Sequence, residues 1–320
     1  MQLAFVFPGQ GSQSVGMLAD LAGAQPVVRE TFAEASDALG YDLWNLVQNG
    51  PAEDLNQTQR TQPAMLAAGV AVWRVWRRMA GPLPTMMAGH SLGEYTALVC
   101  AGALSFSDAI KLVALRGQYM QQAVPAGEGA MAAVLGLTDQ QVIEVCRQAQ
   151  GNEVAEAVNF NSPGQVVIAG HAAAVNRALE AAKAAGAKRA LLLPVSAPSH
   201  CKLMKPAAER LAAALATLPI AIPGLRVIHN ADVASYSNSD QIRDALVRQL
   251  YSPVRWVETV QVMVAAGTGA VVECGPGNVL AGLNKRIVKA IKAYAVFDRA
   301  SLEQTLQQTA GGSQSEECMT

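Results

Sequence analysis

The feature that most constrains the fold is the pattern of short apolar segments between residues 129 and 196. Its elements are predicted to be a strand at 130–135, a helix at 139–150, strands at 154–159 and 165–169, a helix at 172–185 and a strand at 189–194. Ser162-Pro163-Gly164 marks a turn between the two middle strands, and Thr138 marks the start of the first helix. The order β-α-β-β-α-β predicts a ferredoxin-like unit. We therefore place a ferredoxin-like small subdomain at residues 128–196, inserted into a larger one.

On both sides of this unit, strands alternate with helices. Strands are predicted at 3–7, 86–89, 226–229 and 270–273, and helices at 26–39, 63–79, 91–101, 107–123, 202–218, 241–250, 256–266 and 279–288. Pro26 and Pro63 are expected near the first turn of their helices, where proline is tolerated. This alternation predicts an α/β fold with a mostly parallel sheet. The large subdomain is therefore predicted to comprise residues 1–127 and 197–310, followed by a disordered Gly-, Ser- and Glu-rich tail at 311–320.

Composition and charge exclude several classes of protein. The 24 Lys and Arg residues nearly balance the 25 Asp and Glu residues, and no basic stripe stands out, so we expect no nucleic-acid partner. No apolar run reaches the roughly 18 residues that a membrane helix needs, and the N-terminus lacks the basic start of a signal peptide. The five cysteines are odd in number and share no CxxC spacing, which predicts a reducing, cytoplasmic setting without a zinc site.

The clearest chemical motif is Gly-His-Ser-Leu-Gly at residues 89–93, which matches the G-x-S-x-G nucleophile elbow. A predicted strand precedes it and a predicted helix follows it, as that motif requires. A serine at such a turn projects its hydroxyl from the backbone, while the start of the helix directs N–H groups toward a developing oxyanion. Ser91 is therefore a candidate nucleophile, with the N–H of Leu92 as an oxyanion donor. The alternative is a purely structural turn.

A nucleophilic serine needs a base, and the chain has four histidines. We favour His200, because it lies in a loop just before a predicted helix, where catalytic groups are often placed. The other three are expected to point away from the serine, to lie on the surface or to be structural: His90, His171 and His229. No carboxylate stands out as the third member of a Ser-His-Asp triad. An α/β-hydrolase also places its histidine close to the C-terminus, whereas here a long stretch of chain follows His200. The pattern therefore indicates a serine acyl-transfer enzyme other than an ordinary hydrolase.

Two further residues break local rules. Arg116 lies on an apolar stripe of the helix at 107–123, where an unpaired charge is costly, so it needs an anion. That anion could belong to a structural salt bridge, or to a substrate carboxylate held by the guanidinium fork. Gln10 lies in a glycine-rich turn directly after the first predicted strand, but the turn fails the G-x-G-x-x-G pattern at Ser14. The turn is therefore better explained as one that points the N–H of Gln10 into a site than as a dinucleotide-binding turn. That N–H is a candidate for the second oxyanion donor.

With these residues in place, the chain resembles the malonyl-CoA:acyl carrier protein transacylase family over roughly residues 1–305. The resemblance rests on FPGQGSQ at 7–13, TQPA at 61–64, GHSLGEY at 89–95, LRG around Arg116, NFNSPGQVVIAG at 159–170, PSH at 198–200, YSPVRW at 251–256 and ECGPGNVL at 273–280. So many motifs in the same order make the resemblance highly specific. It implies an α/β-hydrolase-like large subdomain and an inserted ferredoxin-like small one.

The resemblance also implies a role for each candidate residue. Ser91 would be the nucleophile and His200 its base, in a dyad without an acid. The main-chain carbonyl of Gln249 would orient His200, which accounts for the missing carboxylate. The remaining roles are oxyanion donation by the main chains of Gln10 and Leu92, binding of the malonyl carboxylate by Arg116, and lining of the substrate site by Asn159 and Gln62.

The implied reaction is ping-pong transfer of malonyl from malonyl-CoA to the phosphopantetheine thiol of an acidic acyl carrier protein. No metal and no cofactor beyond the two substrates is expected, and we expect a monomer. Alternatives are a malonyl transferase serving another carrier, such as that of malonate decarboxylase, and a thioesterase or esterase. A polyketide synthase domain is disfavoured because the chain opens on its first predicted strand. An idle carrier-binding scaffold would require a lost Ser91 or His200, and both are present.

Overall fold

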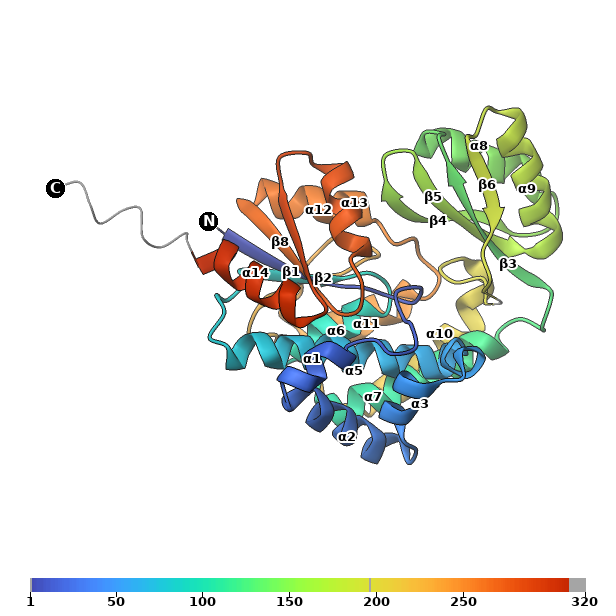
Figure 1. Ribbon diagram of the computed structural model, residues 1–320. Helices are drawn as coiled ribbons and strands as arrows, with labels where there is room; N and C mark the ends of the chain where they lie inside the picture. The colour runs from blue at the N-terminus through green and yellow to red at the C-terminus, as the bar shows by residue number, and fades with distance from the viewer. Residues whose placement is uncertain (1, 196, 311–320) are drawn as a thin grey trace. The chain divides into compact units, whose positions relative to one another are not determined.

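The computed structural model describes residues 2–195 and 197–310 (Figure 1). The predicted tail at 311–320 lies outside the described residues. The chain divides into two compact units. The first unit comprises Met1–Ala114, Ala221–Ile228 and Val262–Thr320, and the second comprises Leu115–Ile220 and His229–Gln261. The second unit is wider than the small subdomain expected at 128–196, because it also takes in helices from both sides of that stretch. The predicted subdomain boundaries themselves stay a prediction.

A parallel sheet forms the centre of the first unit, with the strand order β7-β2-β1-β8-β9. Its strands are β1 (Gln2–Phe7), β2 (Met86–Gly89), β7 (Arg226–Ile228), β8 (Thr268–Cys274) and β9 (Lys292–Val296). β1 is buried from Leu3 to Phe7, as an apolar central strand of a parallel sheet should be. The predicted parallel sheet is thus confirmed. The edge strand β9 was not predicted, because its short, partly exposed segment has no clear period.

Helices flank this sheet in the first unit. They are α1 (Ala19–Ala24), α2 (Val27–Leu39), α3 (Leu43–Asn49), α4 (Ala52–Leu55), α5 (Thr58–Arg78), α6 (Gly93–Cys100), α13 (Val279–Ile287) and α14 (Arg299–Ala310). The predicted start of α5 was wrong, because Pro63 lies inside the helix and not in its first turn. The residues before Pro63 that face the core are polar (Thr58, Thr61 and Gln62), so the apolar period begins too late to show where the helix starts.

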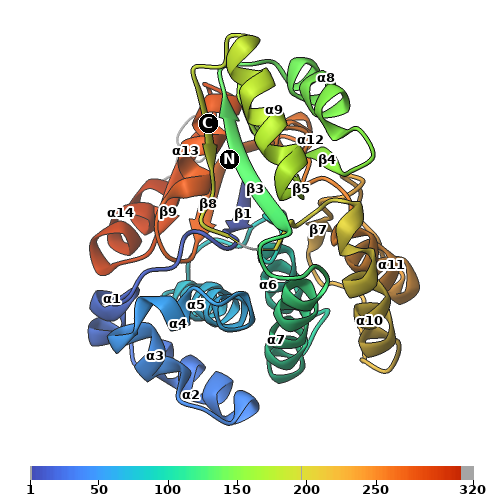
Figure 2. The same cartoon turned by 90° about the vertical axis from the view of Figure 1, so that its right-hand side faces the viewer.

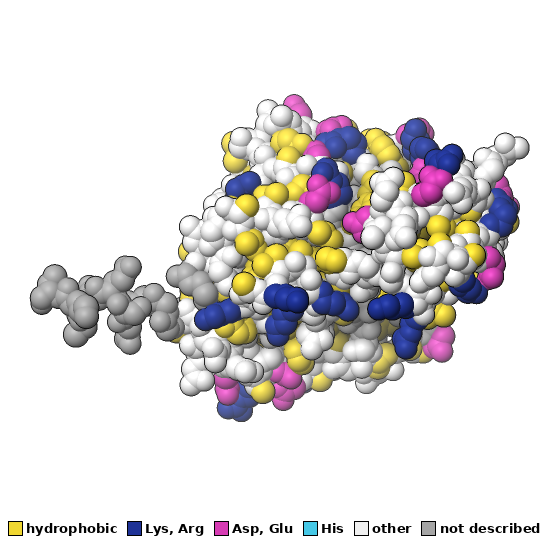
Figure 3. All heavy atoms as spheres, turned by 90° about the horizontal axis from the view of Figure 1, so that it is seen from above, with side chains coloured by type: hydrophobic (Ala, Val, Ile, Leu, Met, Phe, Trp, Pro, Cys, Tyr) yellow, Lys and Arg dark blue, Asp and Glu magenta, His cyan; other side chains and the backbone are white. Residues whose placement is uncertain are grey.

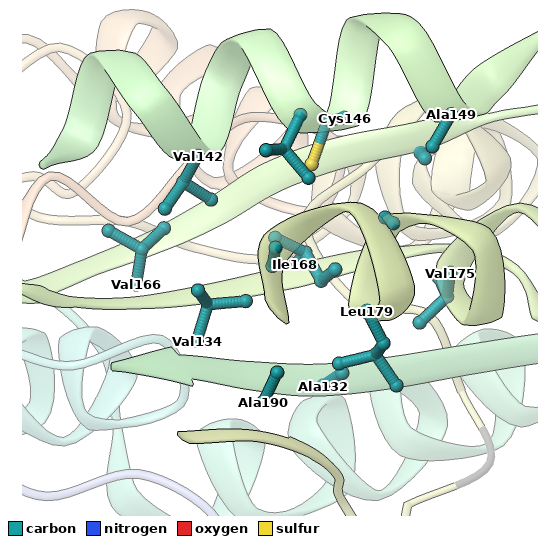
Figure 4. Packing of buried hydrophobic residues seen from close by; sticks show 14 of the residues in the cluster. Ala132, Val134, Val142, Cys146, Ala149, Val166, Ile168, Val175, Leu179 and Ala190 are labelled. Atoms are coloured by element: carbon teal, nitrogen blue, oxygen red, sulfur yellow. The ribbon is translucent and has the colours of Figure 1, made fainter. Parts of the chain in front are cut away.

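A separate antiparallel sheet lies in the second unit, with the order β4-β5-β3-β6. Its elements are β3 (Gly129–Leu135), α8 (Asp139–Gln150), β4 (Ala155–Ser162), β5 (Gln165–His171), α9 (Ala172–Ala184) and β6 (Arg189–Leu192), which is the predicted order β-α-β-β-α-β. Figure 4 shows the core between helices and strands, where Val142 and Leu179 face Val134 and Ile168. Thr138 opens α8 with a capping box, as predicted.

Further helices of the second unit follow the antiparallel sheet along the chain. They are a 3₁₀ turn (Lys202–Met204), α10 (Lys205–Ala216) and α11 (Ser239–Gln249), while α7 (Phe106–Gln122) and α12 (Trp256–Ala265) each continue from one unit into the other. The single helix predicted at 202–218 is therefore a 3₁₀ turn followed by α10. Figure 2 shows α10 and α11 running side by side. After α11 the chain pairs with β4, where Phe160 N donates to Val254 O at 3.0 Å and Val254 N donates to Val158 O at 2.8 Å.

One face of the described structure carries charged side chains of both signs (Figure 3). On the face drawn in Figure 3, Lys and Arg side chains and Asp and Glu side chains both occur among hydrophobic and uncharged groups. Within residues 2–195 and 197–310, none of the helices combines the length and apolar character that crossing a bilayer requires.

Glu273, near the end of β8, is a buried carboxylate that ties this strand to α13. Its side chain is 0% exposed, and its Oε2 accepts a hydrogen bond from Ala281 N at 2.8 Å. Burial raises the pKa of the Glu273 carboxyl from 4.5 to about 7, although the N–H groups of Ala281, Leu280 and Val279 act in the opposite direction. Between pH 4.5 and about 7, the folded protein therefore holds more of a proton on Glu273 than the unfolded chain does.

This raised pKa predicts a pH-dependent stability. The contribution of Glu273 is full below the unfolded pKa of 4.5 and is lost as the pH rises through the folded pKa of about 7. Over that range we expect the wild-type free energy of unfolding to fall by about 3 kcal/mol relative to Glu273→Gln. Urea unfolding of both proteins at a series of pH values measures this difference, with the exposed Glu53→Gln as control. A difference that does not change with pH would contradict the raised pKa.

Candidate active site

Ser91 lies in a sharp turn between β2 and α6. Its φ of 52° is in the left-handed region that non-glycine residues seldom adopt. His90 N donates to Phe7 O at 2.9 Å before the serine, and Glu94 N donates to Ser91 O at 3.0 Å after it. The turn is thus held by the neighbouring strand β1 and by the first turn of the helix. Strain of this kind is typical of a nucleophile elbow, in agreement with the sequence motif.

The glycines around Ser91 are required by close packing of the backbone. A Cβ atom on Gly89 would lie 1.8 Å from the carbonyl carbon of Gly93, and one on Gly93 would lie 2.0 Å from Phe7 O. A Cβ atom on Gly9 would lie 2.5 Å from His90 O. The G-x-S-x-G motif and the glycine-rich turn after β1 therefore pack closely against each other through their backbones.

The first unit also contains the two candidate oxyanion donors. Leu92 is 1% exposed and precedes the first residue of α6, so its N–H belongs to the positive end of that helix. Gln10 follows β1, the strand next to β2, and its side-chain Nε2 donates to Thr58 Oγ1 at 3.5 Å. Gln62, in α5, is 1% exposed and lies in the same unit. The catalytic roles assigned to these residues stay predictions.

His200 lies in the second unit and is held at both its backbone and its ring. Its N–H donates to Leu250 O at 3.0 Å, and its ring Nδ1 lies 2.8 Å from Gln249 O. A carbonyl oxygen can only accept, so Nδ1 carries the proton and donates, and in the neutral ring Nε2 is the basic nitrogen. The residue is 2% exposed, with a φ of 67°. The carbonyl of Gln249 is therefore placed where it can orient His200 as a base.

Arg116 is fixed by the same glutamine. Its Nη2 donates to Gln249 Oε1 at 2.9 Å, and the two residues are 1% and 0% exposed, respectively. A buried guanidinium costs a large desolvation energy unless its donors are satisfied. We refer to Arg116, His200 and Gln249 as the histidine cluster. Within the second unit, this cluster holds the guanidinium of Arg116 and the imidazole of His200 through one residue, Gln249.

The side chain of Gln249 is a site residue that the sequence prediction missed, since only its carbonyl was assigned. A signal was present, however. The buried residues Ile242, Ala245 and Leu246 of α11 lie on one helical face, and Gln249 continues that face at the next helical position. A polar residue on an apolar stripe needs a partner, as was recognised for Arg116.

Asn159 also lies in the second unit, half-buried in β4. It forms a β-bridge with Val254, a few residues after Gln249. The structure therefore joins β4 to the segment that follows the histidine cluster. Whether Asn159 lines a substrate site stays a prediction.

The remaining histidines occupy structural positions. His171, half-buried, precedes α9, and its ring Nδ1 accepts a hydrogen bond from Val154 N at 2.9 Å. His229 is 1% exposed, and its ring centroid lies 5.3 Å from that of Tyr236. His90 belongs to the serine turn, where its carbonyl accepts from Gly93 N at 3.0 Å. These contacts favour His200 over the other three as the candidate base.

The strained serine turn of the first unit and the oriented histidine of the second are the residue types that the sequence predicts for a serine acyl-transfer protein. The model of the acyl transferase domain family matches residues 4–316, nearly the whole chain. The chain therefore belongs to the acyl transferase family.

Within this family, the chain is similar to proteins named malonyl CoA-acyl carrier protein transacylase. The chain is 59% identical to the malonyl CoA-acyl carrier protein transacylase of Escherichia coli strain K12 over 306 residues, covering 96% of this chain and 99% of that one. It is 62% identical to the Haemophilus influenzae protein of the same name over 301 residues, covering 94% and 96%.

Solved structures agree with these relatives. The crystal structure of an acyl carrier protein S-malonyltransferase from Vibrio cholerae matches with a TM-score of 0.93 at 61% identity, covering 95% of this chain and all of that one. A malonyl-transacylase in complex with its type II PKS acyl-carrier protein matches with a TM-score of 0.95 at 58% identity, covering 96% and 100%.

Proposed function

We propose that this protein transfers the malonyl group of malonyl-CoA to the phosphopantetheine thiol of an acyl carrier protein, through a malonyl ester on Ser91. The product supplies the extender unit for fatty-acid synthesis. Relatives at 59% and 62% identity that carry this activity in their names support the proposal. The observation that carries it within the chain is the histidine cluster, where Gln249 contacts both the candidate base and the candidate carboxylate-binding arginine.

In the first half-reaction, Ser91 Oγ attacks the thioester carbonyl carbon while His200 Nε2 takes the hydroxyl proton. The main-chain N–H groups of Gln10 and Leu92 stabilise the negative oxygen of the tetrahedral intermediate. That intermediate collapses by breaking the C–S bond, and the departing sulfur of coenzyme A receives the proton from His200. The malonyl group is left as an ester on Ser91.

The second half-reaction reverses these roles. The carrier thiol loses its proton to His200, and its sulfur attacks the ester carbonyl carbon. The C–O bond to Ser91 breaks, and the serine oxygen takes the proton back from His200. Throughout, the guanidinium of Arg116 pairs with the free carboxylate of the malonyl group, which acetyl and other neutral acyl groups lack.

The test of the transferase function is the fate of the malonylated protein. Mixing it with holo acyl carrier protein should transfer the malonyl group to the carrier far faster than water releases malonate. Mass spectrometry of the two proteins over time measures both rates, with apo carrier protein, which lacks the phosphopantetheine arm, as the control. Release of free malonate at the same rate with and without holo carrier would indicate a thioesterase instead.

The proposal extends to architecture and setting. We assign the parallel sheet and its helices to an α/β-hydrolase-like large subdomain at 1–127 and 197–310, and the antiparallel sheet with α8 and α9 to a ferredoxin-like small subdomain at 128–196. The order of the antiparallel strands, β4-β5-β3-β6, supports the second assignment. The reaction needs no cofactor or metal beyond its two substrates, and its place is the cytoplasm, where fatty-acid synthesis substrates are found. We assign a monomer in transient contact with the acidic carrier protein.

A further inference from the structure

Gln249 uses two different oxygens to hold two different residues. Its main-chain oxygen lies 2.8 Å from His200 Nδ1, and its side-chain Oε1 accepts from Arg116 Nη2 at 2.9 Å. The carbonyl contact needs only a backbone and survives any substitution that leaves α11 in place. The side-chain contact, in contrast, depends on the amide group itself. The two tasks of Gln249 can therefore be separated by mutation.

The end of α11, where Gln249 lies, is linked to two other segments of the second unit. Arg248, its neighbour, forms ion pairs with Asp244 at 2.6 Å and with Asp232 at 2.8 Å. The segment beyond is paired with β4 through Val254. A buried amide on a fixed helix end can hold a long, otherwise flexible arginine side chain in one geometry, which is how supporting residues preorganise a binding site.

The neutrality of this amide also matters. A glutamate in the same place would accept the same hydrogen bond from Arg116, but its negative charge would pair with the guanidinium. A substrate carboxylate would then have to compete with an internal one. An uncharged acceptor fixes the guanidinium without neutralising its positive charge.

We propose that the side-chain amide of Gln249 is a specificity-determining positioning residue, which fixes Arg116 for a carboxylate-bearing acyl group while its carbonyl orients His200. This inference rests on the proposed function. Gln249 acts through Arg116 and His200. One residue thereby aligns the acid-recognising group with the base, so that both are held by a single helix end.

The test compares a charged substrate with a neutral one in two variants. Gln249→Met keeps the length of the side chain but removes the acceptor, and Gln249→Glu keeps the acceptor but adds charge. We expect kcat/KM for malonyl-CoA to fall roughly tenfold to a hundredfold in both, chiefly through KM, with the larger loss in Gln249→Glu. Hydrolysis of p-nitrophenyl acetate, which has no free carboxylate, should lose far less rate than malonyl transfer and should keep its pH profile, because the carbonyl still holds His200.

Two controls distinguish a positioning role of Gln249 from a merely structural role and from the carboxylate-binding role of Arg116. Gln241→Met, on the exposed side of the same helix, should leave both substrates unaffected. Arg116→Ala tests the carboxylate-binding role itself. If Arg116→Ala impairs malonyl transfer while Gln249→Met does not, the positioning role is wrong and the proposed function stands. If both substrates lose activity in parallel in the Gln249 variants, the side chain is merely structural. If Arg116→Ala has no effect, the proposed role of Arg116 fails first.

Discussion

Replacing Ser91 by alanine is expected to abolish malonylation of the protein and to lower its transferase rate by at least about 10⁴-fold. The reason is chemical, since alanine lacks the hydroxyl on which the malonyl ester forms. The fold should survive, because alanine meets the same backbone requirement as serine at a φ of 52°. Mass spectrometry after mixing with malonyl-CoA measures the outcome directly, as one added malonyl group on the wild type and none on the variant.

The matched control for this experiment is Ser14→Ala. Ser14 is an exposed serine of the same unit, outside the turn between β2 and α6. Its variant should be malonylated as fully as the wild type. An adduct that persists in Ser91→Ala would overturn the assignment of the nucleophile and would direct attention to another hydroxyl or thiol.

Replacing Arg116 by alanine is expected to have the second-largest effect, on the choice of substrate. Loss of a buried guanidinium that pairs with a substrate carboxylate should cost about 3 kcal/mol, which lowers kcat/KM for malonyl-CoA roughly 100-fold. Transfer of acetyl groups should not fall, because they offer no carboxylate to Arg116. Parallel kinetics with malonyl-CoA and acetyl-CoA measure the ratio. Arg116→Lys should give an intermediate result, since lysine keeps the charge but not the bidentate fork.

Arg210 is the matched control for Arg116. It is an exposed arginine on α10 whose guanidinium lies 4.0 Å from the ring centroid of Tyr119, on the same helix as Arg116. Arg210→Ala therefore removes an arginine from the same neighbourhood without touching the histidine cluster, and it should leave the preference for malonyl unchanged. Unchanged malonyl kinetics in Arg116→Ala would instead exclude that residue from carboxylate recognition.

Much of the fold could be predicted, because local patterns express it directly. The β-α-β-β-α-β unit has short apolar strands, a capping box at Thr138 and a turn at Ser162-Pro163-Gly164, and each of these is a local signal. The serine turn could also be predicted from the sequence, since its glycines are needed for backbone contacts that no other residue type allows. The parallel sheet followed from strands that alternate with helices.

Other elements had no local signal. The start of α5 was missed because its first buried residues are polar, and β9 was missed because an edge strand with one partner has little apolar pattern. The side chain of Gln249 was overlooked, although its place on the buried face of α11 could have revealed it. Its partner Arg116 is 133 residues away along the chain, and no spacing rule connects the two.

The sequence by itself therefore determined most of the elements, the turn at Ser91 and the set of residue types that acyl transfer needs. Hydrophobic period, turn chemistry and glycine positions act over a few residues, so a linear reading can recover them. Only the tertiary structure decided that Gln249 joins Arg116 to His200, and that His200 carries its proton on Nδ1. Those contacts bring together groups that lie far apart along the chain and are buried in the fold. The pairing therefore follows from packing and desolvation, which no local pattern encodes.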